Sequence, residues 1–89
     1  MEIIWTEYMQ YRAKLRGFDL GEIKRIVRYT GERYVDTVTG RLVAIGRHKG
    51  VLVLIPCEIE AQMLIPITIH VTTRQQINLR LKTGRLAYE

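Results

Sequence analysis

The sequence predicts an α+β fold in a single domain over residues 1–89. The expected order is a short β-strand, two α-helices, a four-stranded antiparallel β-meander and a C-terminal α-helix. Three observations predict it: two helix-capping signals before residue 31, strand-like segments separated by compact turn signals over 33–72, and a third capped segment after them. A chain of 89 residues is long enough for one modest core.

The N-terminal segment predicts a strand and a helix. Residues 2–5 read as a short first strand. Thr6 is a typical helix cap, and Gly17 ends the periodic segment, so we expect a helix over 7–16. Its apolar positions recur at helical spacing and are expected to face the core: Tyr8, Tyr11 and Leu15.

A second helix is expected to begin at Asp19. Glu22 follows three residues later, as in a capping box, and Gly31 stops the segment. The apolar side chains Ile23, Ile26 and Val27 recur at helical spacing, whereas basic side chains occupy the other side. Both N-terminal helices are therefore expected to have basic outer faces.

The meander is expected to contain strands over 33–38, 41–48, 51–59 and 64–72. Thr39-Gly40 and Lys49-Gly50 are compact hairpin signals, and residues 60–63 make the third reversal. A closing helix over 73–82 follows, with Thr72 or Thr73 as its cap.

Alternation along these strands divides the sheet into two faces. One face carries bulky side chains, including Tyr34, Ile45, Leu54 and Ile69, and is expected to lie beneath the two N-terminal helices. The other face has small residues around Gly46, and glycine within a strand often marks close approach by a ligand. Arg33, His48 and His70 are expected to surround this shallow surface around Gly46.

At the margin of the sheet, Arg41 and Glu58 are expected to form a cross-strand ion pair.

The charge favours a polyanionic partner. The net charge is +5, with ten arginines against four lysines and an isoelectric point near 9.7. Nucleic acid and an acidic protein both fit this balance. A solvated basic surface without a specific ligand remains the alternative.

The location is expected to be cytoplasmic. No run of about 18 apolar residues is present, so we expect no membrane-spanning segment, and the first residues do not resemble a secretory signal. Cys57 is the only cysteine and cannot form an internal disulfide.

Three segments carry a resemblance to a known family: YRAKLRGFDLGEIKRIV, RYVDTVTGRLVAIGR and ITIHVTTRQQINLRL. In their order and spacing they resemble the RelE-like bacterial toxins, and their local sequence is more similar to the BrnT-like branch of that group. The resemblance implies a RelE-like fold and a ribonuclease (an mRNA interferase) that acts on free or ribosome-bound RNA. It also implies an acidic antitoxin protein that neutralises the enzyme.

The chemistry that this resemblance implies needs neither a metal ion nor a cofactor. The 2′-hydroxyl of the RNA attacks the adjacent phosphate, which requires proton transfer and stabilisation of the crowded phosphate. Imidazole suits the proton transfer and arginine suits the phosphate. His70 is the first candidate for general acid or base, His48 is the second, and Arg33 would hold phosphate. Nucleic-acid binding is expected from further basic residues: Arg47, Arg74, Arg80, Lys82 and Arg85.

Two other interpretations stay open. The same basic surface could serve a non-catalytic module that binds RNA or an acidic protein. Exposed strand edges could instead join two copies as a homodimer.

Overall fold

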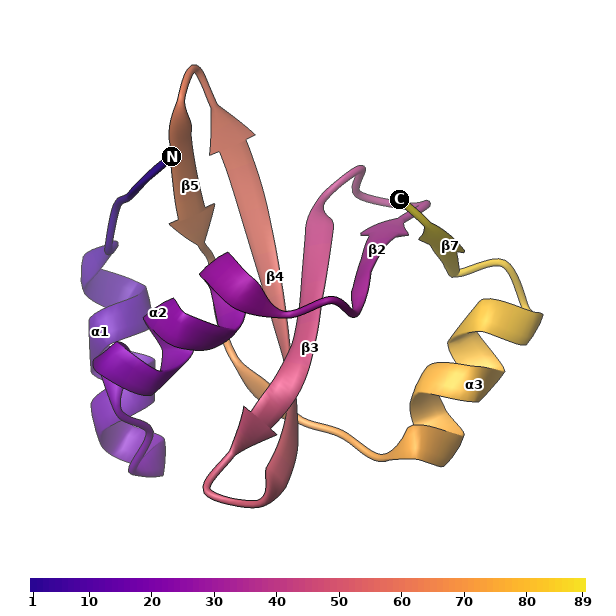
Figure 1. Ribbon diagram of the computed structural model, residues 1–89, viewed down its shortest axis with the longest axis horizontal. Helices are drawn as coiled ribbons and strands as arrows, with labels where there is room; N and C mark the ends of the chain where they lie inside the picture. Colours follow the sequence, from indigo (N-terminus) through magenta and orange to yellow (C-terminus); the bar gives the residue numbers. More distant parts are fainter.

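A computed structural model describes all residues, 1–89, as three helices and seven strands arranged in layers. The N-terminal helices cover one face of the sheet, and the C-terminal helix covers the other (Figure 1). No helix has the length and apolar character needed to cross a membrane. In chain order the elements are β1 (Glu2–Ile3), α1 (Glu7–Arg16), α2 (Leu20–Tyr29), β2 (Arg33–Asp36), β3 (Leu42–His48), β4 (Val51–Glu60), β5 (Met63–Pro66), β6 (His70–Val71), α3 (Arg74–Lys82) and β7 (Leu86–Tyr88).

The three helices and the mixed sheet confirm the α+β class. The order of the strands in the sheet is β1-β5-β4-β3-β2-β7. The short strand β6 pairs with β4 beyond the end of β5. Strand β1 runs parallel to β5, whereas the other pairs are antiparallel. The expected meander lacked β7, which returns after α3 and adds an edge strand beside β2.

The three helices form where the caps predict them. The hydroxyl of Thr6 accepts the N–H of Met9 at 3.0 Å, and the carboxylate of Asp19 accepts the N–H of Glu22 at 3.3 Å. Thr73 is the cap of α3 and accepts the N–H of Gln76 at 3.1 Å. Each cap satisfies a backbone donor that the helix leaves unpaired.

Two hairpins have the expected register, and the first differs by two residues. Gly46 pairs with Val53 and Glu58 pairs with Ile65 as expected. Arg33, however, pairs with Ala44 instead of Gly46. The turn after β2 is wider than two residues because the carboxylate of Asp36 accepts the N–H groups of residues 38 and 39, at 2.8 and 3.1 Å. A two-residue shift leaves every side chain on its expected face.

A bulge separates β5 from β6. Cys57 pairs with Pro66, but Val53 pairs with Val71, so one extra residue lies on the β5–β6 side. This residue exchanges the faces of the last strand. Ile69 is buried beneath the N-terminal helices, and His70 shares the α3 face with Leu54.

The expected coverage of the faces is wrong in one respect. The face with Gly46, not the bulky face, lies beneath α1 and α2. A Cβ atom at Gly46 would lie 2.6 Å from Cγ2 of Ile26 in α2, so this glycine admits a helix and not a ligand. The core on this face contains Met9, Ala13, Ile23, Ile26, Val27, Leu42, Ala44, Val53, Ile55, Cys57, Leu64 and Ile69.

The bulky face packs instead against the C-terminal helix and β7. Its core contains Tyr34, Val43, Ile45, Leu52, Leu54, Ile77 and Leu86. Because Ile77 is the one fully buried residue of α3, this helix covers only part of the face. The uncovered part is available for a site.

Helix α1 is rotated relative to the expectation. Met9 and Ala13 face the core, whereas Tyr8, Tyr11 and Leu15 are 55, 62 and 65% exposed. The small side chain of Ala13 lets the helix lie close to the sheet, which the spacing of the larger residues did not indicate.

Asp36 provides a test of the β2–β3 turn. Hydrogen bonds from Arg85, and then from backbone N–H groups of the turn, lower the pKa of Asp36 to about 2 from 3.8. Asp36→Asn is therefore expected to cost about 1 kcal/mol at pH 7, because the Arg85 side of the pair is largely exposed. The folded pKa lies below the unfolded value, so the carboxylate stabilises the fold above about pH 4 and loses this contribution as the pH falls toward 2. Urea unfolding at several pH values checks this, and a difference between the two proteins that stays constant down to pH 2 would contradict it.

Candidate functional site

The expected group of Arg33, His48 and His70 around Gly46 does not exist. His48 is 3% exposed at the end of β3, and its Nε2 atom accepts the backbone N–H of Asp19 at 2.9 Å. Its ring also packs edge-on against Phe18. His48 therefore supports the start of α2, and no substrate can reach it.

Arg33 lies on the opposite face of the sheet from His70. It pairs with Ala44 of the N-terminal core, and its guanidinium donates to the carbonyl of Val27 at 2.8 Å. Its Nε atom lies 3.6 Å from the carboxylate of Glu89. These contacts tie α2 to the sheet, so Arg33 cannot share a catalytic pocket with His70.

His70 is the predicted catalytic residue that remains accessible. It lies on the edge strand β6, and Arg12 of α1 reaches around this edge from the other face. Nε of Arg12 donates to the carbonyl of Ile69 at 3.3 Å, and its NH2 group lies 3.1 Å from Nδ1 of His70. Because guanidinium only donates, Nδ1 accepts and the ring proton is placed on Nε2.

Three arginines act on the charge of this imidazole, and Arg12 is the one in contact with it. Desolvation of the ring, followed by the positive charges of Arg12, Arg16 and Arg80, lowers the pKa of His70 below its usual 6.5. The imidazole is therefore neutral at pH 7. None of the three arginines pairs with a carboxylate. We call Arg12, Arg16, His70 and Arg80 the His70 cluster.

The His70 cluster borders a hollow of about 260 Å³ on the α3 side of the sheet. The floor of this α3-side hollow is apolar and comes from Val43, Leu54 and Pro56. Its other lining residues are Asp36, Thr39, Arg41, Thr68, His70, Arg80 and Arg85. Arg85 is paired with Asp36 and Arg41 is paired with Glu58, so the positive surplus of the hollow comes from Arg80, and it suits an anionic ligand with an apolar part.

Two of the predicted RNA-binding arginines are held by carboxylates. Arg74 makes a two-bond ion pair with Glu32, whose carboxylate also accepts the hydroxyl of Tyr34. Arg85 makes two bonds of 3.1 Å with Asp36. Glu32 directly precedes β2 and Asp36 ends it, so both pairs join the C-terminal segment to this part of the chain, and neither arginine has its full charge free for a phosphate.

The other predicted basic residues lie in different places. Arg80 lines the α3-side hollow, and Lys82 is exposed at the end of α3. Arg47 donates to the carbonyl of Gly50 at 3.0 Å in the β3–β4 hairpin. Of the five predicted nucleic-acid contacts, Arg80 is the one that belongs to the His70 cluster.

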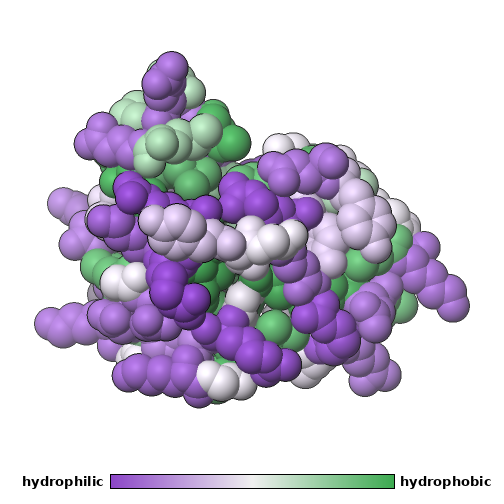
Figure 2. Space-filling view, in the orientation of Figure 1, coloured by the Kyte–Doolittle hydropathy of each residue, from purple (hydrophilic) through white to green (hydrophobic).

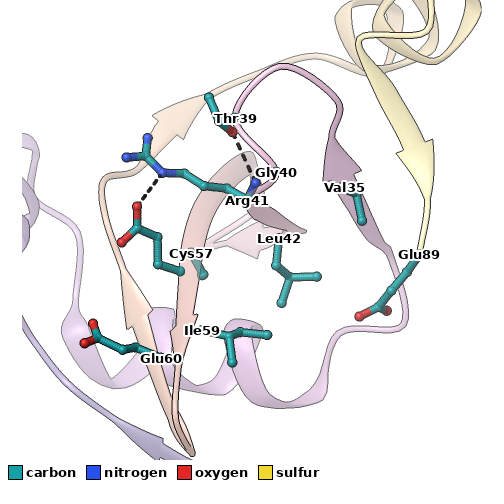
Figure 3. Close-up of a pocket in the computed structure, with 10 residues that line it drawn as sticks. Val35, Thr39, Gly40, Arg41, Leu42, Cys57, Ile59, Glu60 and Glu89 are labelled. Atoms are coloured by element: carbon teal, nitrogen blue, oxygen red, sulfur yellow. Dashed lines mark hydrogen bonds and ion pairs between the residues drawn. The ribbon is translucent and has the colours of Figure 1, made fainter.

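A larger hollow of about 400 Å³ lies on the face of the N-terminal helices, between the β2–β3 turn and the end of β4. Figure 3 shows Leu42 and Ile59 near its centre, with Glu60 and Glu89 on either side. Arg41 pairs with Glu58 at its rim at 3.1 Å, as expected from the sequence. In Figure 2 this region is the notch beside the protruding β4–β5 hairpin. Because its carboxylates outnumber its arginine, the hollow does not suit a polyanion.

Sequence reasoning missed Arg12 and Arg16. They lie four residues apart and share one side of α1, which is a visible signal for a basic patch. That this side meets β6 could not be read from the sequence, because the bulge sets the position of His70. The ion pair of Arg41 with Glu58 could be predicted from the sequence, because the two residues are direct cross-strand neighbours.

The chain offers little else that is reactive. Burial raises the pKa of the Cys57 thiol to about 12, so this cysteine is an unreactive part of the core. No group of three or more His, Cys, Asp or Glu side chains is arranged to hold a metal ion. The His70 cluster and the α3-side hollow are thus the strongest candidate site.

Comparison of the chain with protein-family models, curated proteins and solved structures gave no match.

Proposed function

We propose that this protein is a metal-independent endoribonuclease of the RelE-like kind, which holds single-stranded RNA in the α3-side hollow. One observation carries the proposal: Arg12 of α1, which has no carboxylate partner, lies 3.1 Å from the imidazole of His70, and Arg80 of α3, which also has none, lines the same hollow as that ring. Arginine is the side chain best suited to bind phosphate, and neutral imidazole can accept a proton near pH 7.

The proposed reaction begins with attack of a 2′-hydroxyl on the adjacent phosphate. A bond forms between the 2′ oxygen and phosphorus, the bond to the 5′ oxygen breaks, and a 2′,3′-cyclic phosphate results. The cluster arginines would stabilise the charge that builds on the phosphate oxygens. The hollow holds a single imidazole, so His70 can serve one of the two proton transfers, and water must serve the other, because a guanidinium stays protonated.

Arg12 sets a condition on this chemistry. While it donates to Nδ1, the lone pair of His70 is occupied and Nε2 carries the proton. For His70 to act as the base through Nδ1, Arg12 must turn from the ring to the phosphate. A bound phosphate provides the negative charge that would favour this exchange.

The resemblance to RelE-like toxins extends the proposal to partners and location. An acidic antitoxin would cover the basic surface by charge complementarity, and the pair would act in the cytoplasm. The exposed edge strand β7, next to β2, offers unpaired backbone groups through which two copies could also pair.

A non-catalytic module that binds RNA or an acidic protein is the second candidate. The specific observation in its favour is that Arg12 occupies Nδ1 of His70 while the other imidazole, His48, is buried. In this case the Nε2–H group of His70 would donate a hydrogen bond to a phosphate, and the ring would keep its proton.

Incubation of the purified protein with defined single-stranded RNA, with and without EDTA, tests the proposal. We expect cleavage that is insensitive to EDTA and yields 2′,3′-cyclic phosphate ends. His70→Gln should reduce the rate by about 100-fold or more, since positioned acid–base groups contribute on this scale. Arg47→Gln, which removes an arginine remote from the hollow, is the matched control and should leave the rate unchanged.

The two candidates give different results in this assay. RNA that is bound but remains intact would overturn the nuclease and support the binding module. RNA that is neither bound nor cleaved would overturn both. An equal thermal midpoint for His70→Gln and the unaltered protein shows that the loss is not one of folding.

A further inference from the structure

Helix α1 exposes its large apolar side chains. Met9 and Ala13 make its contact with the core, whereas Tyr8, Tyr11 and Leu15 are 55, 62 and 65% exposed. These three residues are spaced by three and four positions and so form one continuous stripe along the helix. Packing within the chain does not require them to be aromatic or bulky.

The stripe adjoins the His70 cluster. Arg12 lies one turn from Tyr8, and Arg16 lies one turn from Arg12, on the side of the helix between the stripe and the core. Arg12 reaches β6, where it contacts the carbonyl of Ile69 and the ring of His70. The exposed tyrosines of α1 therefore lie next to the edge of the candidate RNA site, with Arg12 between them and His70.

The charge of this helix favours a polyanion over a neutral peptide, and its aromatic side chains favour a nucleic acid among polyanions. Its one carboxylate is Glu7 in the first turn, whereas Arg12, Lys14 and Arg16 follow, and neither Arg12 nor Arg16 is paired with an acid. Aromatic rings interleaved with unpaired cations are the pattern of single-stranded nucleic-acid platforms, since bases stack on the rings and phosphates bind the cations.

We propose that single-stranded RNA leaves the α3-side hollow over the edge strand β6 and continues along α1, where its bases stack on Tyr8 and Tyr11. This inference rests on the proposed function, because it needs RNA in the hollow. Arg12 then lies between the two parts of the path and contacts the phosphate that joins them. The protein therefore contacts nucleotides beyond the one in the hollow. Tyr8 and Tyr11 would accept any base, because stacking uses the flat face that every base has.

The experiment measures the affinity of the full chain for a dinucleotide and for a decanucleotide RNA. We expect Tyr8→Ala and Tyr11→Ala each to weaken decanucleotide binding by about tenfold, as for the loss of one stacked base. Dinucleotide binding should not change, and the dependence on salt should keep its slope because no cation is removed. Tyr8→Phe and Tyr11→Phe retain the ring and should bind as the unaltered protein does.

Tyr29→Ala is the matched control. Tyr29 is 77% exposed at the end of α2, so its replacement removes a ring that is more accessible than Tyr8 or Tyr11 and belongs to another helix. All these positions are exposed, and equal thermal midpoints would show that the variants fold.

The outcomes separate this inference from the proposed function. Unchanged decanucleotide affinity in the two α1 alanine variants, with normal RNA binding, would overturn the inference. Loss of affinity in Tyr29→Ala of the same size would also overturn it. Failure of the unaltered protein to bind either RNA would overturn the proposed function, and the inference with it.

Discussion

Replacing Gly46 with alanine is expected to destabilise the protein by about 2 kcal/mol, as overpacking of a filled core does. The added Cβ atom would lie 2.6 Å from Cγ2, 3.0 Å from Cγ1 and 3.3 Å from Cβ of Ile26. Ile26 is itself 2% exposed and cannot turn away into solvent. Helix α2 must therefore move away from β3, which loosens the core that both elements share.

A double-mutant cycle with Ile26→Ala isolates this contact. Ile26→Ala removes the two atoms nearest to the new methyl group, so Gly46→Ala in that background should cost almost nothing. Gly31→Ala is the control, because a Cβ atom at Gly31 meets nothing within 4 Å. Denaturant unfolding of the variants gives the coupling free energy.

An additive cycle would contradict the helix contact. It would return Gly46 to the role that the sequence suggested, which is close approach by a ligand. In the structure that role is excluded, since the space above Gly46 is filled by Ile26.

Local signals predicted the helices well because each of their causes lies within a few residues. The hydroxyl of Thr6, the carboxylate of Asp19 and the hydroxyl of Thr73 each accept a backbone N–H three residues further on. The β3–β4 hairpin was equally predictable. Lys49 and Gly50 both adopt positive φ, as a two-residue turn of this kind requires, and they set the register through Gly46 and Val53.

The faces of the sheet could not be assigned in the same way. Alternation separates two sets of side chains, but it does not say which helix covers which set. Gly46 and Ala44 looked like an open surface because they are small, whereas they are small because α2 packs closely on them. A small residue in a strand is compatible with either a helix or a ligand, and the choice depends on tertiary packing.

The candidate site was predictable in part. His70 was identified from its residue type, but the bulge that moves it to the α3 face leaves no clear signal in the sequence. The arginines were visible as charges, yet their partners were not. Arg74 and Arg85 are held by Glu32 and Asp36, which lie more than 40 residues away along the chain.

The largest effect on RNA binding is expected from replacing Arg12, Arg16 and Arg80 with glutamine together. Each phosphate contact contributes about 0.7 to the slope of log affinity against log salt for a single strand, so the loss of three should flatten the slope by about 2. At 0.1 M salt this corresponds to affinity about 100-fold weaker. The three side chains have no carboxylate partners, so their removal leaves no acidic group without its counter-charge.

A second triple variant separates the His70 cluster from net charge. Lys24, Arg28 and Arg47, replaced together by glutamine, remove the same charge from side chains that also lack carboxylate partners and do not line the α3-side hollow. Fluorescence anisotropy with a labelled RNA over a range of salt compares the two variants. If both slopes flatten equally, binding follows overall charge and the cluster has no special role. If the slope changes mainly in the cluster variant, the phosphates bind where arginines from opposite layers of the fold meet at His70.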